Sequence, residues 1–254
     1  MRALNVSERR TAPPRVGVST VIFALQPPAG QPVGDAPHDG ATLWLPLVRR
    51  TRAPFTGRWA LPGGPLAWDT SLEESARSTL HEATGLSPRY LEQLYTFGGR
   101  DRSATDLRVV TVAYWALIAL ADRTPMESVE NVAWYSVDAL PPLAFDHADI
   151  VALARRRLRA KATYTGVAVR FLGEEFTLGE LRRVHDAVLG RTSDPANFRR
   201  RMLASGRVEP TGAVRRDGAH RPARCYRFVA EPDAELLTPA PTPAETTERK
   251  RRTS

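Results

Sequence analysis

The chain has 254 residues, 42% hydrophobic and 25% charged, a composition typical of a soluble globular protein with one large or two ordinary domains. It contains no apolar run of about 18 residues, which excludes a membrane span, and its first residues lack the apolar core of a secretory signal. We therefore expect a cytoplasmic protein. The single cysteine, Cys225, excludes an internal disulfide, and the five scattered histidines are interpreted as solvated or structural, so we predict neither a metal site nor a cofactor.

The net charge of +8 is concentrated in one part of the chain. Residues 151–230 contain 18 Lys and Arg against 7 Asp and Glu, whereas residues 1–150 contain 14 basic and 16 acidic residues. A concentrated basic surface gains affinity for a polyanion because binding releases counterions from the phosphates. A solvated arginine-rich surface is the alternative, and charge alone does not distinguish the two.

The first half of the chain predicts strands and helices in mixed order. An apolar, β-branched run at 15–25 predicts a buried strand with a partner at 43–48, separated by a Pro- and Gly-rich surface loop. After a Gly63-Gly64 turn, Ser71 and Glu74 form a capping box for a helix that stops at Gly85. Further strands are predicted at 91–97, 108–120 and 132–137, and a helix at 147–161. This order indicates an α/β/α sandwich with a mixed sheet.

The pattern changes beyond Lys161 to short helices and a hairpin. Thr177 is a candidate N-cap for a helix ending at Gly190, and Asp194-Pro195 opens a second helix that runs to Gly206. Strands at 208–214 and 224–229 flank a basic turn. Two helices joined by a short turn and followed by a β-hairpin describe a winged helix-turn-helix.

We accordingly divide the chain into four parts. They are a flexible N-terminus (1–14), an α/β/α ligand-sensing domain (15–160), a winged helix-turn-helix domain (161–230) and a disordered tail (231–254).

The segment from Gly64 to Gly85 resembles a Nudix box, whose glutamates hold divalent metal against a nucleoside-diphosphate substrate. The glycine frame is present, but of the acidic residues only Glu82 remains, because Thr70, Ser78, Thr79 and Ala83 stand where the family has Glu, Arg, Glu and Glu. Mg²⁺ requires several oxygen ligands that converge on one site. We therefore predict no enzymatic activity and no catalytic residue. Glu73 and Glu74 are either substitute ligands or complements to the helix dipole.

The chain as a whole resembles the Nudix-related transcriptional regulators of NAD metabolism, in which a Nudix domain precedes a winged helix. The resemblance is carried by five blocks, at residues 57–64, 91–98, 176–181, 197–200 and 221–226. It implies a repressor of NAD biosynthesis or salvage genes that senses ADP-ribose or a related nucleotide. It also implies a homodimer that binds a palindromic operator in double-stranded DNA.

Candidate DNA-binding residues lie in three places. In the second helix of the winged domain, arginine suits guanine edges and phosphates, and asparagine suits adenine; Phe198, Met202 and Leu203 are assigned to its inner face. We expect the first helix to contact backbone phosphate and the tip of the hairpin to contact phosphate or the minor groove. The candidates are Asn197, Arg199, Arg200 and Arg201; Thr177, Arg182 and Arg183; and Arg215, Arg216, His220 and Arg221.

Candidate ligand-binding residues are Arg58, Gly63, Gly64, Glu82, Arg102 and Arg108. Each arginine is a candidate for a phosphate of the nucleotide, with an ordinary surface arginine as the alternative. The competing hypothesis for the whole chain is a nucleoside-diphosphate-sugar pyrophosphatase with an accessory nucleic-acid-binding domain. In that case Glu82 and either Glu73 or Glu74 would hold Mg²⁺.

Overall fold

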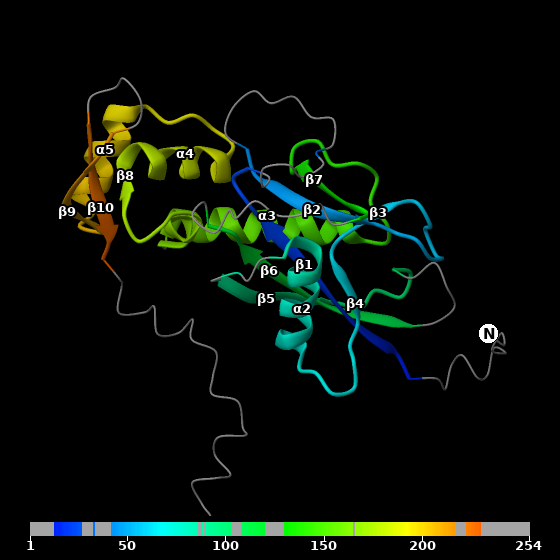
Figure 1. The fold of residues 1–254 in the computed structure, drawn as a ribbon. Helices are drawn as coiled ribbons and strands as arrows, with labels where there is room; N and C mark the ends of the chain where they lie inside the picture. The colour runs from blue at the N-terminus through cyan, green and yellow to red at the C-terminus, as the bar shows by residue number, and fades with distance from the viewer. Residues whose placement is uncertain are drawn as a thin grey trace, which may run out of the picture.

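The structure, a computed structural model, describes residues 13–26, 33, 42–85, 88, 90–102, 108–119, 130–164, 166–216 and 222–229 (Figure 1). The predicted tail and most of the predicted N-terminal segment lie outside these ranges. The elements of the first half are β1 (Arg15–Phe23), β2 (Trp44–Arg49), β3 (Trp59–Ala60), β4 (Gly63–Pro65), α2 (Leu72–Thr84), β5 (Tyr90–Phe97), β6 (Val109–Leu117), β7 (Val132–Ser136) and α3 (His147–Tyr164). The second half contains η2 (Gly166–Phe171), β8 (Phe176–Thr177), α4 (Leu178–Leu189), α5 (Pro195–Ala204), β9 (Val208–Arg215) and β10 (Ala223–Phe228).

The first half forms two sheets, with strand orders β4-β1-β6-β5 and β3-β2-β7. Strands β1 and β6 are parallel, whereas β4 and β5 are antiparallel to their neighbours, so the larger sheet is mixed as predicted. Strand β1 is covered on both faces, because its side chains alternate between two hydrophobic clusters. Val21 and Phe23 pack with Leu158 of α3, whereas Ile22 packs with Leu80 of α2. The predicted α/β/α sandwich is confirmed.

Helix α2 begins and ends where the sequence predicts. The Ser71 side chain accepts a hydrogen bond from the Glu74 backbone N–H, the Glu74 carboxylate accepts one from the Ser71 N–H, and Gly85 ends the helix at φ 63°. The predicted Gly63-Gly64 turn is wrong in one respect. Both glycines lie in the short strand β4, which pairs with β1, because glycine lets the two backbones approach closely.

The second half is a winged helix-turn-helix. Thr177 caps α4 with a full capping box, Gly190 ends α4 at φ 66°, and Asp194 caps α5 with Pro195 in its first turn. The three strands lie in the order β8-β10-β9. The sequence did not predict strand β8, whose two residues pair with Tyr226 and Cys225.

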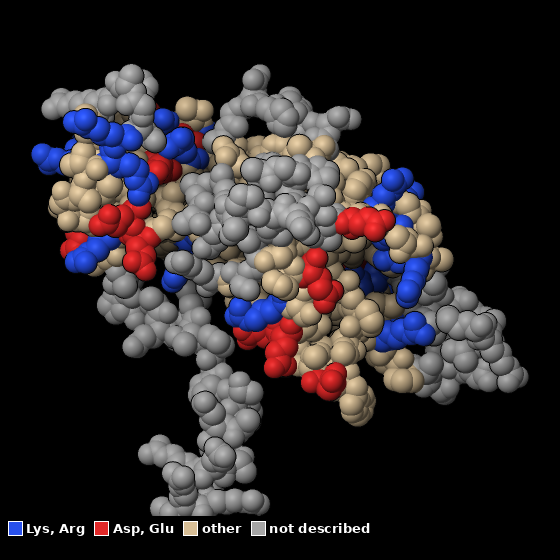
Figure 2. Space-filling view, viewed as in Figure 1, with Lys and Arg blue, Asp and Glu red and all other residues tan. Residues whose placement is uncertain are grey.

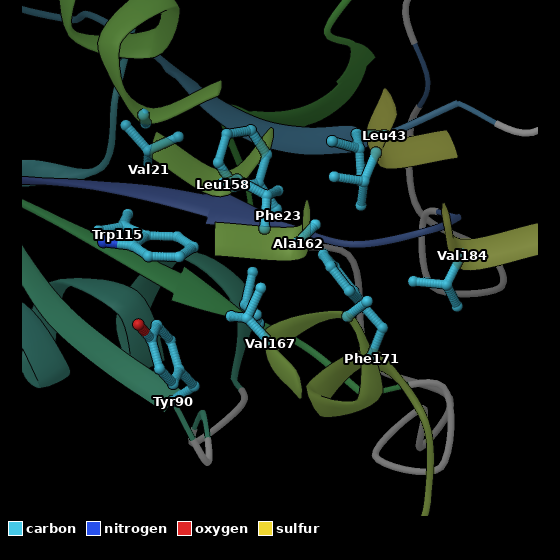
Figure 3. Close-up of a cluster of buried hydrophobic side chains, with 14 of the residues drawn as sticks. Val21, Phe23, Leu43, Tyr90, Trp115, Leu158, Ala162, Val167, Phe171 and Val184 are labelled. Carbon is cyan, nitrogen blue, oxygen red and sulfur yellow. The ribbon is translucent and has the colours of Figure 1, made fainter. Parts of the chain in front are cut away.

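The two halves share one hydrophobic cluster. It includes Trp115 and Leu158 from the sandwich and Phe171 and Val184 from the C-terminal half (Figure 3). Helix α3 extends from the sandwich toward the winged helix and passes through the predicted boundary at residues 160 and 161 (Figure 1). The winged helix is therefore packed against the sandwich by apolar contact. No helix in the described part of the chain is long and apolar enough to cross a membrane.

Candidate nucleotide and DNA sites

The two candidate glycines of β4 lie in different surroundings. A Cβ atom at Gly63 would lie 2.3 Å from the Val18 carbonyl oxygen and 2.9 Å from the Ser19 Cα, so only glycine fits between the paired strands. A Cβ atom at Gly64 would meet no atom of the described residues within 4 Å. Gly63 thus serves strand pairing, whereas Gly64 leaves open space in which a ligand could approach the backbone.

Arg102 is buried and held by protein groups. Its guanidinium donates to both carboxylate oxygens of Asp146, at 2.9 and 2.7 Å, and to the Thr111 hydroxyl at 2.6 Å. The Arg102 side chain is only 5% exposed. Thr111 lies opposite Gly17 in β1, and Gly17 lies opposite Pro65 in β4, so the Arg102 loop is anchored beside the two glycines. The bond to Asp146 neutralises the charge, and this geometry supports a positioning role for Arg102.

The remaining ligand candidates are spread over a wider area. Arg108 is exposed, and its guanidinium donates to the Gly98 carbonyl at 2.9 Å near the first residue of β1. Arg58 is also exposed, with its Cζ 5.6 Å from the Phe55 ring centroid. Glu82 belongs to the part of α2 in which Leu80 packs against Ile22, toward the far end of β1. Arg102 thus contacts β6 on one side of β1, Gly63 and Gly64 lie in β4 on the other side of β1, and Glu82 lies on α2, which contacts β1 and β4.

His147, at the first residue of α3, is a site residue that sequence reasoning did not single out. Its Nδ1 accepts a hydrogen bond of 3.0 Å from the Leu61 backbone N–H, which ties α3 to the segment that leads into β4. Its neighbour Asp146 forms an ion pair with Arg102. Asp146, His147 and the segment at Leu61 that leads into β4 together form the β4 corner. The only sequence signal is that an Asp-His pair begins a helix, which is too common to be specific.

The buried His147 ring should make stability depend on pH. Burial lowers the pKa of His147 to about 4 from its ordinary 6.5, so the unfolded chain binds more protons than the folded one. The stabilisation is complete above pH 6.5 and is lost as pH falls toward 4, by about 3 kcal/mol. Urea unfolding between pH 7 and 4.5 should show this loss in wild type and less of it in His147→Gln, whose amide oxygen can still accept from Leu61. His81→Gln, a substitution at an exposed histidine, is the control and should behave as wild type. If His147→Gln loses as much unfolding free energy between pH 7 and 4.5 as wild type does, His147 is not the source of the pH dependence.

The face of α2 that carries the metal ligands in a Nudix box has few carboxylates in this chain. Ala83 is buried, and the carboxylate of the exposed Glu82 accepts a hydrogen bond of 2.8 Å from Ser78. Glu73 forms an ion pair of 2.8 Å with Arg77, and Glu74 completes the capping box, which lowers its pKa through hydrogen bonds from Ser71. Within the described residues, no group of three or more His, Cys, Asp or Glu side chains could hold a metal ion. The geometry favours the helix-stabilising role of Glu73 and Glu74.

Helix α5 presents polar side chains on its outer face. Phe198 is the one residue of α5 that is buried, and Asn197, Arg199, Arg200 and Arg201 are exposed. The Arg200 guanidinium donates to the Asn197 side-chain oxygen at 2.6 Å, so these two side chains are held together on the surface. Met202 is half-buried as expected, but the assignment of Leu203 to the inner face is wrong, because Leu203 is 42% exposed near the end of the helix.

Several other DNA candidates are engaged within the protein. Arg182 donates to Asp186 and to the Ser193 carbonyl at 3.0 and 3.1 Å, which ties the turn between α4 and α5 to α4. The Thr177 hydroxyl caps α4, and Arg215 forms an ion pair of 2.8 Å with Glu180. These contacts support positioning of the helices and the hairpin.

Outside α5, two further exposed candidates are Arg183 on α4 and Arg216, the residue after β9. His220 and Arg221 lie outside the described residues. Figure 2 shows Lys and Arg side chains gathered at the end of the molecule where Figure 1 places α4, α5 and the hairpin. The basic excess of the sequence is therefore a surface property of the winged helix.

The fold and its two sites define a class of protein, a Nudix sandwich joined to a DNA-binding type of winged helix. The NUDIX domain model matches residues 37–154, and the NrtR DNA-binding winged helix domain model matches residues 168–228. The chain is 37% identical over 198 residues, 76% of its own length and 78% of the relative, to the ADPR responsive transcriptional repressor NtrR of Acinetobacter baylyi. It belongs to the NrtR family of Nudix-related regulators.

Solved structures agree with this assignment. The crystal structure of Shewanella oneidensis NrtR complexed with a 27mer DNA has a TM-score of 0.70 and 36% identity, and the match covers 87% of this chain and 96% of that one. A weaker relative is an enzyme, the ADP-ribose pyrophosphatase of Methanocaldococcus jannaschii, 28% identical over 105 residues, 41% of this chain and 62% of the relative. That match spans less than half of the chain.

Proposed function

We propose that this protein is a DNA-binding repressor of NAD biosynthesis or salvage genes whose Nudix domain senses ADP-ribose or a related nucleotide. It acts in the cytoplasm as a homodimer on a palindromic operator. The observation that carries the proposal is the exposed Asn197, Arg199 and Arg200 face of α5, in a winged helix that resembles one solved on DNA. The relative described as ADPR responsive supports the choice of effector.

The packing of the two halves supplies a route for regulation. A ligand shifts a conformational equilibrium only if it binds one state better than the other. Because α3 runs from the corner of Asp146 and His147 to the winged helix, a nucleotide bound beside β4 would act on α3 at its first residues. A small displacement of α3 would then change the spacing of the two winged helices in a dimer, and with it the match to two half-sites.

The first test is operator binding in the presence of nucleotide. Fragments of the source genome are selected on the full-length protein, and the affinity for the best fragment is measured by fluorescence anisotropy at fixed salt. ADP-ribose should bind the protein in calorimetry and change operator affinity, by about fivefold or more. AMP and ribose 5-phosphate serve as controls that lack the diphosphate bridge. If no NAD-related nucleotide binds, the sensor role fails and the sandwich is left as a scaffold for dimerisation.

The second test is hydrolysis. With Ala83 buried and Thr79 in place of a carboxylate, we expect negligible cleavage of ADP-ribose with Mg²⁺ or Mn²⁺, because too few oxygen ligands converge. An ADP-ribose pyrophosphatase assayed in parallel provides the positive control. Turnover at about 1 per second or faster, abolished by Glu82→Gln, would favour the competing enzyme hypothesis that the weaker relative suggests.

A further inference from the structure

A pocket of about 280 Å³ lies where the sandwich meets the winged helix. Its walls come from the end of α3, from η2, α4 and α5, from the residue before β9 and from the last residue of β10. It is far in the sequence from the β4 corner, and none of the candidate nucleotide-binding residues lines it. The proposed sensor site therefore does not account for this pocket.

The pocket is apolar at its base and cationic at its rim. Ala162, Ala168 and Leu181 are buried and line the base. Arg191 and Arg201 also line the pocket, and both are exposed. Neither forms an ion pair with a residue that the structure describes, and the Arg201 Cζ lies 5.9 Å from the centroid of the Phe198 ring. Like charges around a small opening repel, and a bound anion would relieve that repulsion.

The remaining walls fix the shape of the pocket. A Cβ atom at Gly166 would lie 2.3 Å from the Phe228 ring, so glycine allows this ring of β10 to dock on η2 and close one side. His185 lines another side, and burial lowers its pKa, with nearby Arg201 adding to this effect and Asp186 opposing it. Arg207, which is half-buried, also lines the pocket.

We propose that this pocket binds a small organic anion, with an apolar body against Ala168 and Leu181 and a phosphate or carboxylate between Arg191 and Arg201. The volume lies just below the range of about 300–1,000 Å³ that holds drug-sized ligands, so a compact single-ring compound fits and a dinucleotide does not. The occupant is therefore chemically distinct from ADP-ribose.

Occupancy should also affect DNA binding, a consequence that rests on the proposed function. Helix α5 supplies Arg201 and Met202 to the pocket, its C-cap residue Ser205 also lines it, and Phe198 is the one buried residue of the helix. A ligand that contacts α5, α4 and η2 together adds contacts to a helix that has few buried side chains of its own. It thereby stabilises one orientation of α5 relative to the sandwich.

Phenyl phosphate is the probe for the pocket, added to the full-length protein without DNA and followed by calorimetry. We expect saturable binding that is stronger than that of inorganic phosphate or benzyl alcohol. Inorganic phosphate lacks the apolar ring, and benzyl alcohol lacks the anionic group. Arg191→Gln, which removes a charge-assisted contact, should weaken binding about tenfold. Leu189→Trp, which fills the pocket from α4, should do the same, whereas Arg156→Gln on the exposed face of α3 is the matched charge control and should not.

The outcomes separate the site from the proposed function. Three outcomes would overturn the proposal that the pocket binds an organic anion. They are equal binding of phenyl phosphate and inorganic phosphate, equal weakening by Arg191→Gln and Arg156→Gln, and no binding at all. Should Leu189→Trp fail to fold, the exposed Arg191→Gln still decides the matter. Operator affinity is then measured with saturating phenyl phosphate at matched ionic strength. A change of about fivefold or more supports coupling through α5, and unchanged operator affinity with confirmed probe binding overturns the coupling alone.

Discussion

Alanine at Arg200 is expected to weaken binding to the operator by about 1–3 kcal/mol and to weaken binding to unrelated DNA much less. The Arg200 guanidinium donates to the Asn197 side chain, so we expect the two side chains to approach a base edge as a unit. Loss of one member should also misplace the other. Asn197→Ala, Arg200→Ala and the double variant should therefore be non-additive.

The matched control removes the same charge from α2, a helix of the sandwich. Arg77 on α2 pairs with Glu73 and is far in sequence from the winged helix, so Arg77→Ala should leave operator affinity unchanged. Titrations are made across a range of salt, because a phosphate contact changes the slope and a base contact changes specificity. Equal affinities of Arg200→Ala and Arg77→Ala for the operator would mean that the arginines of α5 are a solvated surface.

Alanine at Gly63 is expected to destabilise the protein by about 2–4 kcal/mol. The added Cβ would lie 2.3 Å from the Val18 carbonyl oxygen, and this atom belongs to the backbone of β1, so no side-chain rotation relieves the contact. Pairing of β4 with β1 would be lost. Thermal unfolding should show a decrease in Tm of roughly 5–10 °C.

Gly64→Ala is the control for this prediction, because its Cβ would meet nothing within 4 Å in the part of the chain that the structure describes. Its stability should lie within about 0.5 kcal/mol of wild type. This variant also tests the ligand-binding role of β4 without loss of the fold, since a side chain there would occupy the open space beside the backbone. Similar Tm values for the two variants would show that the strands tolerate a side chain at either position.

The sequence by itself determined the features that depend on neighbouring residues. The capping boxes of Ser71 with Glu74 and of Thr177 with Glu180, and the stop at Gly190, are local, because each needs atoms within three or four residues along the chain. The order of strands and helices, and with it the sandwich and the winged helix, follows from the same local patterns. The predicted boundaries agree with the structure to within a few residues.

Only the tertiary structure decided which polar side chains are available to a ligand. The sequence predicted that Arg102 and Arg182 are available to a ligand, but each donates to a carboxylate of the protein. Arg102 bonds Asp146, 44 residues away, and Arg182 bonds Asp186, one helical turn away. The roles of Gly63 and His147 depend on Val18 and Leu61, which lie far away in the sequence. Pairing across the fold is a matter of distance in space, and composition and spacing do not encode that distance. The sequence thus determined that a basic winged helix follows a Nudix sandwich. The packing decided which arginines of the winged helix are exposed and which are bonded within the protein.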